Sequence, residues 1–176
     1  MGMMNKTTAS YVAGLLDGEG SFCIWTVQKE YGRQHRYAVM MSNTNRAICE
    51  WLKNSFGGSF IVKKLEPIER NRKQVFYWHL SNKDILDKFL LVIIPYLKIK
   101  KRAAQILYEF IKTYNSESYV YLGYMKGQAI KQDVFNKRME LYKELKLINS
   151  RGLQPKRLSE ANTFKGVYDS LNLQEK

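Results

Sequence analysis

Two carboxylates, Asp17 and Glu19, stand at the end of the apolar run "YVAGLLDGEGSF". This run predicts a helix over residues 8–17, so both acids lie near the negative end of the helix dipole. Such a placement costs a few tenths of a kcal/mol to about 1 kcal/mol. A positive partner is therefore expected at this helix end, and carboxylate oxygens are ligands that suit a divalent metal ion.

The same helix has small residues on one side. Gly14 and Gly18 are four residues apart, with Ala13 alongside, so another helix backbone could approach closely. Two copies of the helix packed in this way would bring their acidic ends together, and the carboxylates would repel unless cations lay between or beside them. The pattern indicates a divalent metal as the positive partner. The alternative is a C-capped amphipathic helix that packs only on its own sheet.

The charge of the chain narrows the class of partner. Its 176 residues include 29 Lys and Arg against 16 Asp and Glu, a net charge of +13, which indicates a polyanionic partner. Nucleic acid is favoured over a membrane surface, because the bases are spread along the chain and do not flank one wide apolar helix face. The longest apolar run, 89–97, is too short to span a bilayer, and no secretory signal is apparent. We therefore expect an intracellular protein without membrane contact.

The elements that must position the two acids form an α+β pattern. In chain order we expect a helix at 8–17, strands at 21–29 and 36–42, a helix at 46–56, strands at 59–65 and 74–80, and helices at 82–94, 101–114 and 121–147. Asn43 or Asn45 is expected to cap the second helix, and Gly57 with Gly58 to end it. One domain is expected over 1–150, followed by a basic tail over 151–176.

The segment "VAGLLDGEG" resembles the signature motif of the LAGLIDADG homing endonucleases, with identity at five positions: Ala13, Gly14, Leu15, Asp17 and Gly20. The order of predicted elements agrees with that family, and "IPYLKIKKRAAQI" at 94–106 is similar to its later basic segment. The resemblance covers residues 9–114. It implies an αββαββα fold with a saddle-shaped four-stranded antiparallel sheet, here followed by extra C-terminal helices.

The resemblance implies a site-specific DNA endonuclease that uses Mg²⁺. It identifies Glu19 as the metal ligand, with the carbonyl of Gly18 assisting. Asp17 cannot easily share that metal, because residues two apart on a helix point to nearly opposite sides. Asp17 is expected to brace the helix end or a dimer interface that also includes Ala13, Gly14 and Gly18.

The later segment supplies a base. Lys100 matches the catalytic-site lysine of the family, where it could stabilise the charge of the transition state or orient the attacking water. The alternative is that Lys100, like its neighbours Lys98 and Lys101, has no catalytic role, since most lysines in such a cluster are solvated or contact backbone phosphates. After the second strand, Asn43 and Arg46 stand where the family places residues that assist the water network, although the glutamine often found there is absent from this chain.

The strands are expected to read DNA. The resemblance implies that one sheet face enters the major groove, where alternate strand residues meet base edges and phosphates. The candidate DNA-binding residues are Trp25, Lys29, Gln34, Arg36, Lys64, Arg70, Arg72, Gln74, Tyr77 and His79, together with Lys98 and Lys101. Because residues 21–27 are apolar on both sides, Trp25 could equally be buried, and the arginines at 66–73 could belong to a solvated loop.

The chain carries only half of a two-carboxylate site. A second glycine pair, Gly123 and Gly127, is flanked by Lys126 and Gln128 where acids are needed, and too few residues follow it for another ββαββ unit. A homodimer is therefore expected, with one Glu19 from each subunit and a pseudo-palindromic double-stranded DNA target.

Two alternatives stay open. An RNA-binding maturase or a DNA-binding regulator could use the same fold without nuclease activity. A different metal site could also be built from Asp133 with Glu144 and Lys146, but these lie in a helical pattern where such a site needs strands. No phosphate-binding loop of the GxxxxGK[ST] type occurs, so use of a nucleoside triphosphate is not expected.

Overall fold

The structure is a computed structural model, which describes residues 4–29, 32–62, 73–115, 118–121 and 128–150. Its elements are α1 (Lys6–Glu19), β1 (Gly20–Lys29), β2 (Gly32–Asn43), α2 (Arg46–Phe56), β3 (Ser59–Val62), β4 (Phe76–Leu80), α3 (Lys83–Ile93), η2 (Ile94–Tyr96), α4 (Lys101–Lys112), β5 (Tyr119–Tyr121), β6 (Gln128–Ile130) and α5 (Gln132–Asn149). The predicted α+β class and the four-stranded antiparallel sheet are confirmed.

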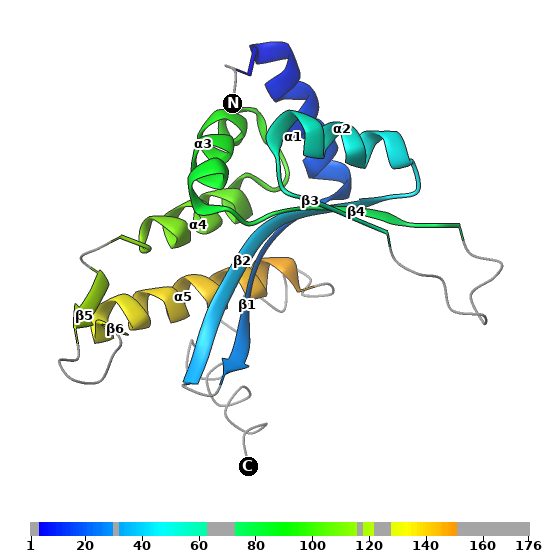
Figure 1. Cartoon of the computed structure of the whole chain (residues 1–176). Helices are drawn as coiled ribbons and strands as arrows, with labels where there is room; N and C mark the ends of the chain where they lie inside the picture. The colour runs from blue at the N-terminus through cyan, green and yellow to red at the C-terminus, as the bar shows by residue number, and fades with distance from the viewer. Residues whose placement is uncertain (1–3, 30–31, 63–72, 116–117, 122–127, 151–176) are drawn as a thin grey trace.

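The main sheet has the strand order β1-β2-β4-β3, and every pair is antiparallel. Strands β1 and β2 form a long hairpin, in which Gly20 pairs with Met41 and Lys29 with Gly32. Figure 1 shows this hairpin extending away from β3 and β4. Strand β1 follows directly from α1, so the sheet fixes the position of the acidic helix end.

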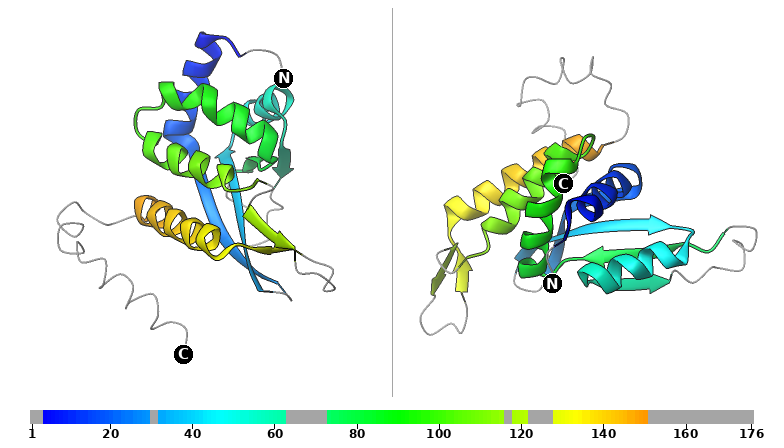
Figure 2. Two further views of the ribbon diagram at one scale, coloured as in Figure 1. Left: turned by 90° about the vertical axis from the view of Figure 1, so that its left-hand side faces the viewer. Right: turned by 90° about the horizontal axis from the view of Figure 1, so that it is seen from above.

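The two faces of the sheet differ in composition. Alternate residues of a strand point to opposite faces, and Phe22, Val39 and Leu80, which are paired across β1, β2 and β4, are all buried. Helices α1, α2, α3 and α4 lie on that side of the sheet (Figures 1 and 2). The opposite face is not covered by any helix of the described part of the chain.

The turn after α2 shows why its two glycines are needed. Gly57 and Gly58 have φ angles of 78° and 88°, a region that residues with a Cβ seldom adopt. The carbonyl of Gly57 accepts a hydrogen bond of 2.8 Å from the indole nitrogen of the fully buried Trp78. The end of α2 is thereby joined to β4 on the inner side of the sheet.

Helix α5 packs against α4 and against the inner side of the β1–β2 hairpin. Arg102 of α4 donates to Glu144 of α5 at 2.7 Å. Arg138 of α5 is 4% exposed and donates from Nε to the hydroxyl of Thr113 at 2.7 Å and from Nη2 to its carbonyl at 2.8 Å. These bonds satisfy groups at the end of α4, so α5 extends the core beyond the first four helices.

The predicted helix over 121–147 is wrong in its first part. Residues 119–121 and 128–130 form the short antiparallel hairpin β5–β6, and the helix begins only at Gln132. The run Tyr119–Tyr121 is aromatic and β-branched, a composition that favours strands. Two glycines follow it in the sequence and disfavour a helix. The predicted tail over 151–176 lies outside the described residues.

No helix in the described ranges is both long enough and apolar enough to cross a membrane.

Candidate active site and nucleic-acid interface

The site begins at the last turn of α1. This helix starts after Asn5, whose side chain accepts a hydrogen bond from the amide of Thr8 at 2.8 Å, and buries Val12 and Leu16 in the core. Its last turn contains no basic residue of its own. The positive partner of the acids must therefore come from elsewhere in the fold.

The carboxylate of Asp17 bonds to the segment just before α4. Its two oxygens accept hydrogen bonds from the backbone amides of Lys98 at 2.7 Å and Lys100 at 2.8 Å. Amides at the start of a helix lack intrahelical partners, and a carboxylate there also interacts favourably with the helix dipole. Asp17 thus closes the end of α1 onto the beginning of α4, within a single chain.

These contacts lower the pKa of Asp17. Partial burial on its own would raise the pKa of this carboxyl, but hydrogen bonds from the backbone amides of Lys100, Lys98 and Ile99, together with the charge of Lys100, outweigh burial and bring the pKa below 3.8. Asp17 is therefore ionised at neutral pH and has both oxygens occupied.

The side chain of Lys100, in turn, bonds to the end of α1. Its ammonium donates to the carbonyl oxygens of Leu16 at 3.1 Å, Gly18 at 3.3 Å and Gly20 at 2.7 Å. A lysine near a helix C-terminus satisfies carbonyls that the helix itself leaves unpaired. We call these contacts and those of Asp17, taken together, the Asp17–Lys100 clamp.

Glu19 is exposed and offers a carboxylate, and Gly18, the residue before it in the chain, offers a backbone carbonyl. Both are hard oxygen donors of the kind that Mg²⁺ and Ca²⁺ prefer, so the residues fit a divalent ion, although they make an incomplete site. Within the described residues, no group of three His, Cys, Asp or Glu could hold a metal in one chain. Completing the site requires ligands from DNA, water or another chain.

The open side of α1 carries its two glycines. A Cβ added at Gly14 or Gly18 would meet nothing within 4 Å, and Tyr11 on the same helix is 53% exposed. Ala13, which we grouped with these glycines, instead lies on the buried side and packs in the core of its own chain. The surface available to a second helix is therefore formed by Gly14 and Gly18 without Ala13.

Asn43 and Arg46 lie where β2 passes into α2. The side chain of Asn43 accepts a hydrogen bond from the amide of Asn45 at 2.8 Å, while Asn45 caps α2. Arg46 donates to Glu50 at 2.8 Å and lies over the ring of Phe60. In the described structure these bonds are local, and none joins Asn43 or Arg46 to the Asp17–Lys100 clamp.

The open face of the sheet gathers several of the DNA-binding candidates. Trp25 pairs with Arg36 across β1 and β2, and its ring lies 6.4 Å from that of His79, edge to face. The alternation of the strands places Gln34 and Tyr77 on the same face. Trp25 is thus on the uncovered side, which the apolar pattern of β1 left open.

The other candidates divide into three groups. Lys29 belongs to β1, but its side chain lies outside the description, as do Lys64, Arg70 and Arg72 entirely. Gln74 precedes β4 and donates to the carbonyl of Val75 at 3.1 Å. The side chains of Lys98 and Lys101 are exposed beside the Asp17–Lys100 clamp.

Comparison with solved structures relates this geometry to known proteins. The homing endonuclease I-CvuI, solved with its DNA target in the presence of Ca, aligns with a TM-score of 0.63 and 18% identity over 85% of this chain and 86% of that chain. The archaeal intron-encoded homing endonuclease I-Vdi141I, complexed with DNA, gives 0.65 and 17% over 85% and 88%. The LAGLIDADG homing endonuclease I-GzeII, also with DNA, gives 0.60 and 18%, over 92% of this chain and 50% of that one.

The chain has the LAGLIDADG homing endonuclease fold. The resemblance stated from the motif and the element order is confirmed by these structures. No protein-family model and no curated protein sequence matches the chain, so this assignment rests on the shape of the molecule together with the motif.

Within the LAGLIDADG fold, the centre of the open sheet face is less polar than we expected. Cys23, Ala38 and Met40 alternate with the inward residues of β1 and β2 and so lie on the same face as Trp25. Burial lowers the pKa of His79 on this face, so its imidazole is neutral at pH 7. The DNA-binding candidates named from the sequence did not include this apolar centre. The signal that could have found it is the alternation of β1, in which Cys23 and Trp25 alternate with the buried Phe22 and Ile24.

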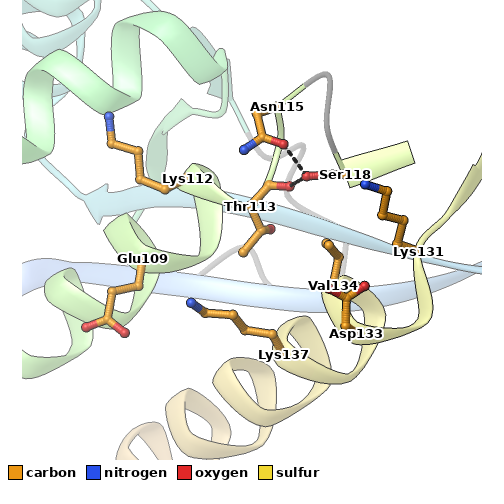
Figure 3. Close-up of a pocket in the computed structure, with 9 residues that line it drawn as sticks. All are labelled: Glu109, Lys112, Thr113, Asn115, Ser118, Lys131, Asp133, Val134 and Lys137. Atoms are coloured by element: carbon orange, nitrogen blue, oxygen red, sulfur yellow. Dashed lines mark hydrogen bonds between the residues drawn. The ribbon is translucent and has the colours of Figure 1, made fainter. Parts of the chain in front are cut away.

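A separate hollow of about 330 Å³ lies between the end of α4 and the start of α5 (Figure 3). It is lined by residues of mixed charge: Glu109, Lys112, Thr113, Asn115, Ser118, Lys131, Asp133, Val134 and Lys137. Lys112 is bonded to Asp87 at 2.7 Å. The alternative metal site is not assembled here, because Asp133 and Glu144 are separated by eleven residues of one helix, roughly 16 Å.

The Asp17–Lys100 clamp predicts a pH-dependent contribution to stability. Because the folded pKa of Asp17 is below 3.8, its contribution is complete above that value and is lost as the pH falls through the folded pKa. Asp17→Asn should lower the free energy of unfolding at pH 7 by about 1 kcal/mol, because the Asn side chain has one oxygen and can accept only one of the two backbone hydrogen bonds. The difference from the wild type should shrink as acid protonates the wild-type carboxylate.

Urea unfolding of both proteins between about pH 7 and about pH 2 measures this difference. The matched control is Glu19→Gln, which removes an exposed charge two residues away. A stability difference that stays constant across this pH range would contradict the role given to Asp17.

Proposed function

We propose that the chain is one subunit of a homodimeric, metal-dependent DNA endonuclease that cuts a long pseudo-palindromic site. The observation that carries the proposal is the end of α1. In one chain this helix end presents one exposed acid, Glu19, on a helix that has open space at Gly14 and Gly18. A second copy on that face would supply a second carboxylate.

The lengths of the related structures support a two-subunit arrangement. This chain covers 86% of I-CvuI but only 50% of I-GzeII. The unit found here therefore corresponds to about half of the longer protein, while one copy of the motif provides only half of the carboxylates. A twofold axis along α1 would place the Glu19 side chains of the two subunits near each other. It would also give the sheets of the two subunits equivalent orientations about the axis.

The proposed chemistry uses this chain's own residues in distinct roles. Glu19 and the Gly18 carbonyl would hold Mg²⁺ or a similar ion. When bound, such an ion lowers the pKa of water and neutralises charge on the phosphate. Asp17 keeps the Lys100 segment against the end of α1, and Lys100 places a positive charge beside the phosphate that is cut. Asn43 and Arg46 remain candidates for orienting water.

The proposed DNA surface is the uncovered face of the sheet. Arg36 would contact phosphates or base edges there, while Trp25 and His79 would offer apolar and neutral polar contacts. The net charge of +13 favours association with any duplex. The DNA complexes of I-CvuI and I-Vdi141I support this choice of partner.

The first test is cleavage of a randomised DNA duplex library by the purified protein, with Mg²⁺ and with a chelator, with the cut ends mapped by sequencing. We expect metal-dependent cuts at a pseudo-palindrome. Glu19→Gln should abolish these cuts while binding persists, since it removes one metal ligand and leaves the sheet intact. Glu140→Gln, the same chemical change at an exposed position of α5, should cut like the wild type.

Two results would contradict this proposal. Equal cutting by Glu19→Gln would exclude the proposed metal ligand. Tight binding without cuts in any of these proteins would favour a maturase or a regulator that uses the same fold.

The dimer can be tested through Gly14. Gly14→Leu places a side chain in open space in the single chain and replaces a poor helix former with a better one, by about 0.8 kcal/mol. The fold should therefore survive while two α1 helices can no longer approach closely. Sedimentation velocity should show a dimer for the wild type and a monomer for Gly14→Leu.

The control for this substitution is Asn54→Leu, on the exposed surface of α2, which should remain dimeric. A Gly14→Leu protein that sediments like the wild type would exclude pairing through this face of α1.

The DNA surface can be tested without knowing the target. Arg36→Ala should weaken binding to a labelled random duplex and reduce the slope of log K against log salt by about 1, because one phosphate contact is lost. Lys53→Ala removes the same charge from α2, on the helical side of the sheet. Fluorescence anisotropy at several salt concentrations should show the lower slope only for Arg36→Ala, and equal slopes in the two variants would exclude the open face as the DNA surface.

A further inference from the structure

The ammonium of Lys100 is fully engaged by backbone carbonyls. An ammonium has three N–H donors, and the three acceptors here are the carbonyl oxygens of Leu16, Gly18 and Gly20. With this geometry Lys100 has no donor left for a phosphate or a water. A direct role in catalysis requires at least one of these hydrogen bonds to be released.

The bond to Gly18 is the one that a metal would break. It is the longest of the three, at 3.3 Å compared with 3.1 Å to Leu16 and 2.7 Å to Gly20. Gly18 also provides the carbonyl expected to assist Glu19 in holding a divalent ion. An ammonium and a divalent cation on one oxygen would repel each other strongly at such short range, so the two should not occupy the carbonyl together.

We propose that Lys100 is a resident cation of the metal site, which leaves the Gly18 carbonyl when a divalent ion binds there. The released N–H donor then becomes available beside Glu19. This inference rests on the proposed function, because it assumes that Glu19 and Gly18 form the metal site.

The Asp17–Lys100 clamp restricts this movement to the side chain. The backbone amide of Lys100 is held by Asp17 at 2.8 Å, and the contact with Gly20 at 2.7 Å is the shortest that the ammonium makes. The stem of Lys100 therefore stays beside the end of α1 while its head changes one acceptor. Metal binding and the availability of Lys100 are coupled, and the catalytic cation is withheld until the metal is present.

This coupling predicts competition between the lysine and the metal. Lys100→Met removes the resident charge and should tighten binding of Mn²⁺ to the full-length protein, roughly tenfold. Lys98→Met removes a charge two residues away, where only the backbone amide contacts Asp17, and should change the affinity much less. The affinity is measured by the electron paramagnetic resonance signal of free Mn²⁺, first without DNA and then with a DNA duplex present, with Glu19→Gln defining the specific site in each condition.

A second measurement follows Lys100 itself. The protein is produced with lysine labelled with ¹³C at Cε and ¹⁵N at Nζ, which leaves all three N–H donors of the ammonium in place, and the Lys100 resonance is assigned by its loss in Lys100→Arg. Addition of Ca²⁺ should shift this resonance in the wild type but not in Glu19→Gln. This readout uses the wild-type fold, so it decides the question if Lys100→Met does not fold.

The outcomes separate this inference from the proposed function. Tighter Mn²⁺ binding in Lys100→Met than in Lys98→Met, or the Ca²⁺-dependent shift where Lys100→Met cannot be measured, supports the resident cation. Glu19-dependent Mn²⁺ binding that is unchanged or weakened in Lys100→Met, or an unmoved Lys100 resonance, overturns the resident cation alone. Absence of any Glu19-dependent binding, both without DNA and with a DNA duplex present, overturns both the resident cation and the proposed metal site.

Discussion

The structure around the acidic end of α1 depends on one physical constraint, which is that two helix ends neutralise each other. The carboxylate of Asp17 satisfies amides at the start of α4, and the ammonium of Lys100 satisfies carbonyls at the end of α1. The negative side chain thus lies at a helix N-terminus and the positive one at a helix C-terminus, where the helix dipole favours each charge. The backbone around Glu19 is held by this arrangement, because the carbonyls of Gly18 and Gly20 on either side of it both accept from Lys100.

Local signals in the sequence predicted most of the fold. The helix Arg46–Phe56 was predicted with its observed bounds because Asn45 caps it and Gly57 ends it. The strands of the main sheet were also predicted, from their β-branched and aromatic composition and the turn residues between them. The helix before Pro95 was predicted from its capping residue and the proline that follows it. The prediction was wrong where these signals conflict, since residues 119–130 form a hairpin and not the start of a long helix.

The sequence predicted the candidate site less completely, for reasons that are physical. It marked Asp17 as an acid in need of a positive partner and Lys100 as a base near the site, but it could not show that the two belong to one clamp. Ala13 was grouped with the glycines, although its side chain points into the core. The outward face of β1 could not be chosen because both of its faces are apolar, and only its pairing with β2 places Trp25 outside.

The hydrogen bonds of the Asp17–Lys100 clamp join residues that are 80 to 84 positions apart in the chain. All the strands of the main sheet are synthesised between these two segments. A nascent chain that has left the ribosome only as far as β4 contains the acidic motif but none of its partners. The acidic helix end can therefore be completed only after all the strands of the main sheet have been synthesised, and a product truncated at β4 carries the motif without the clamp.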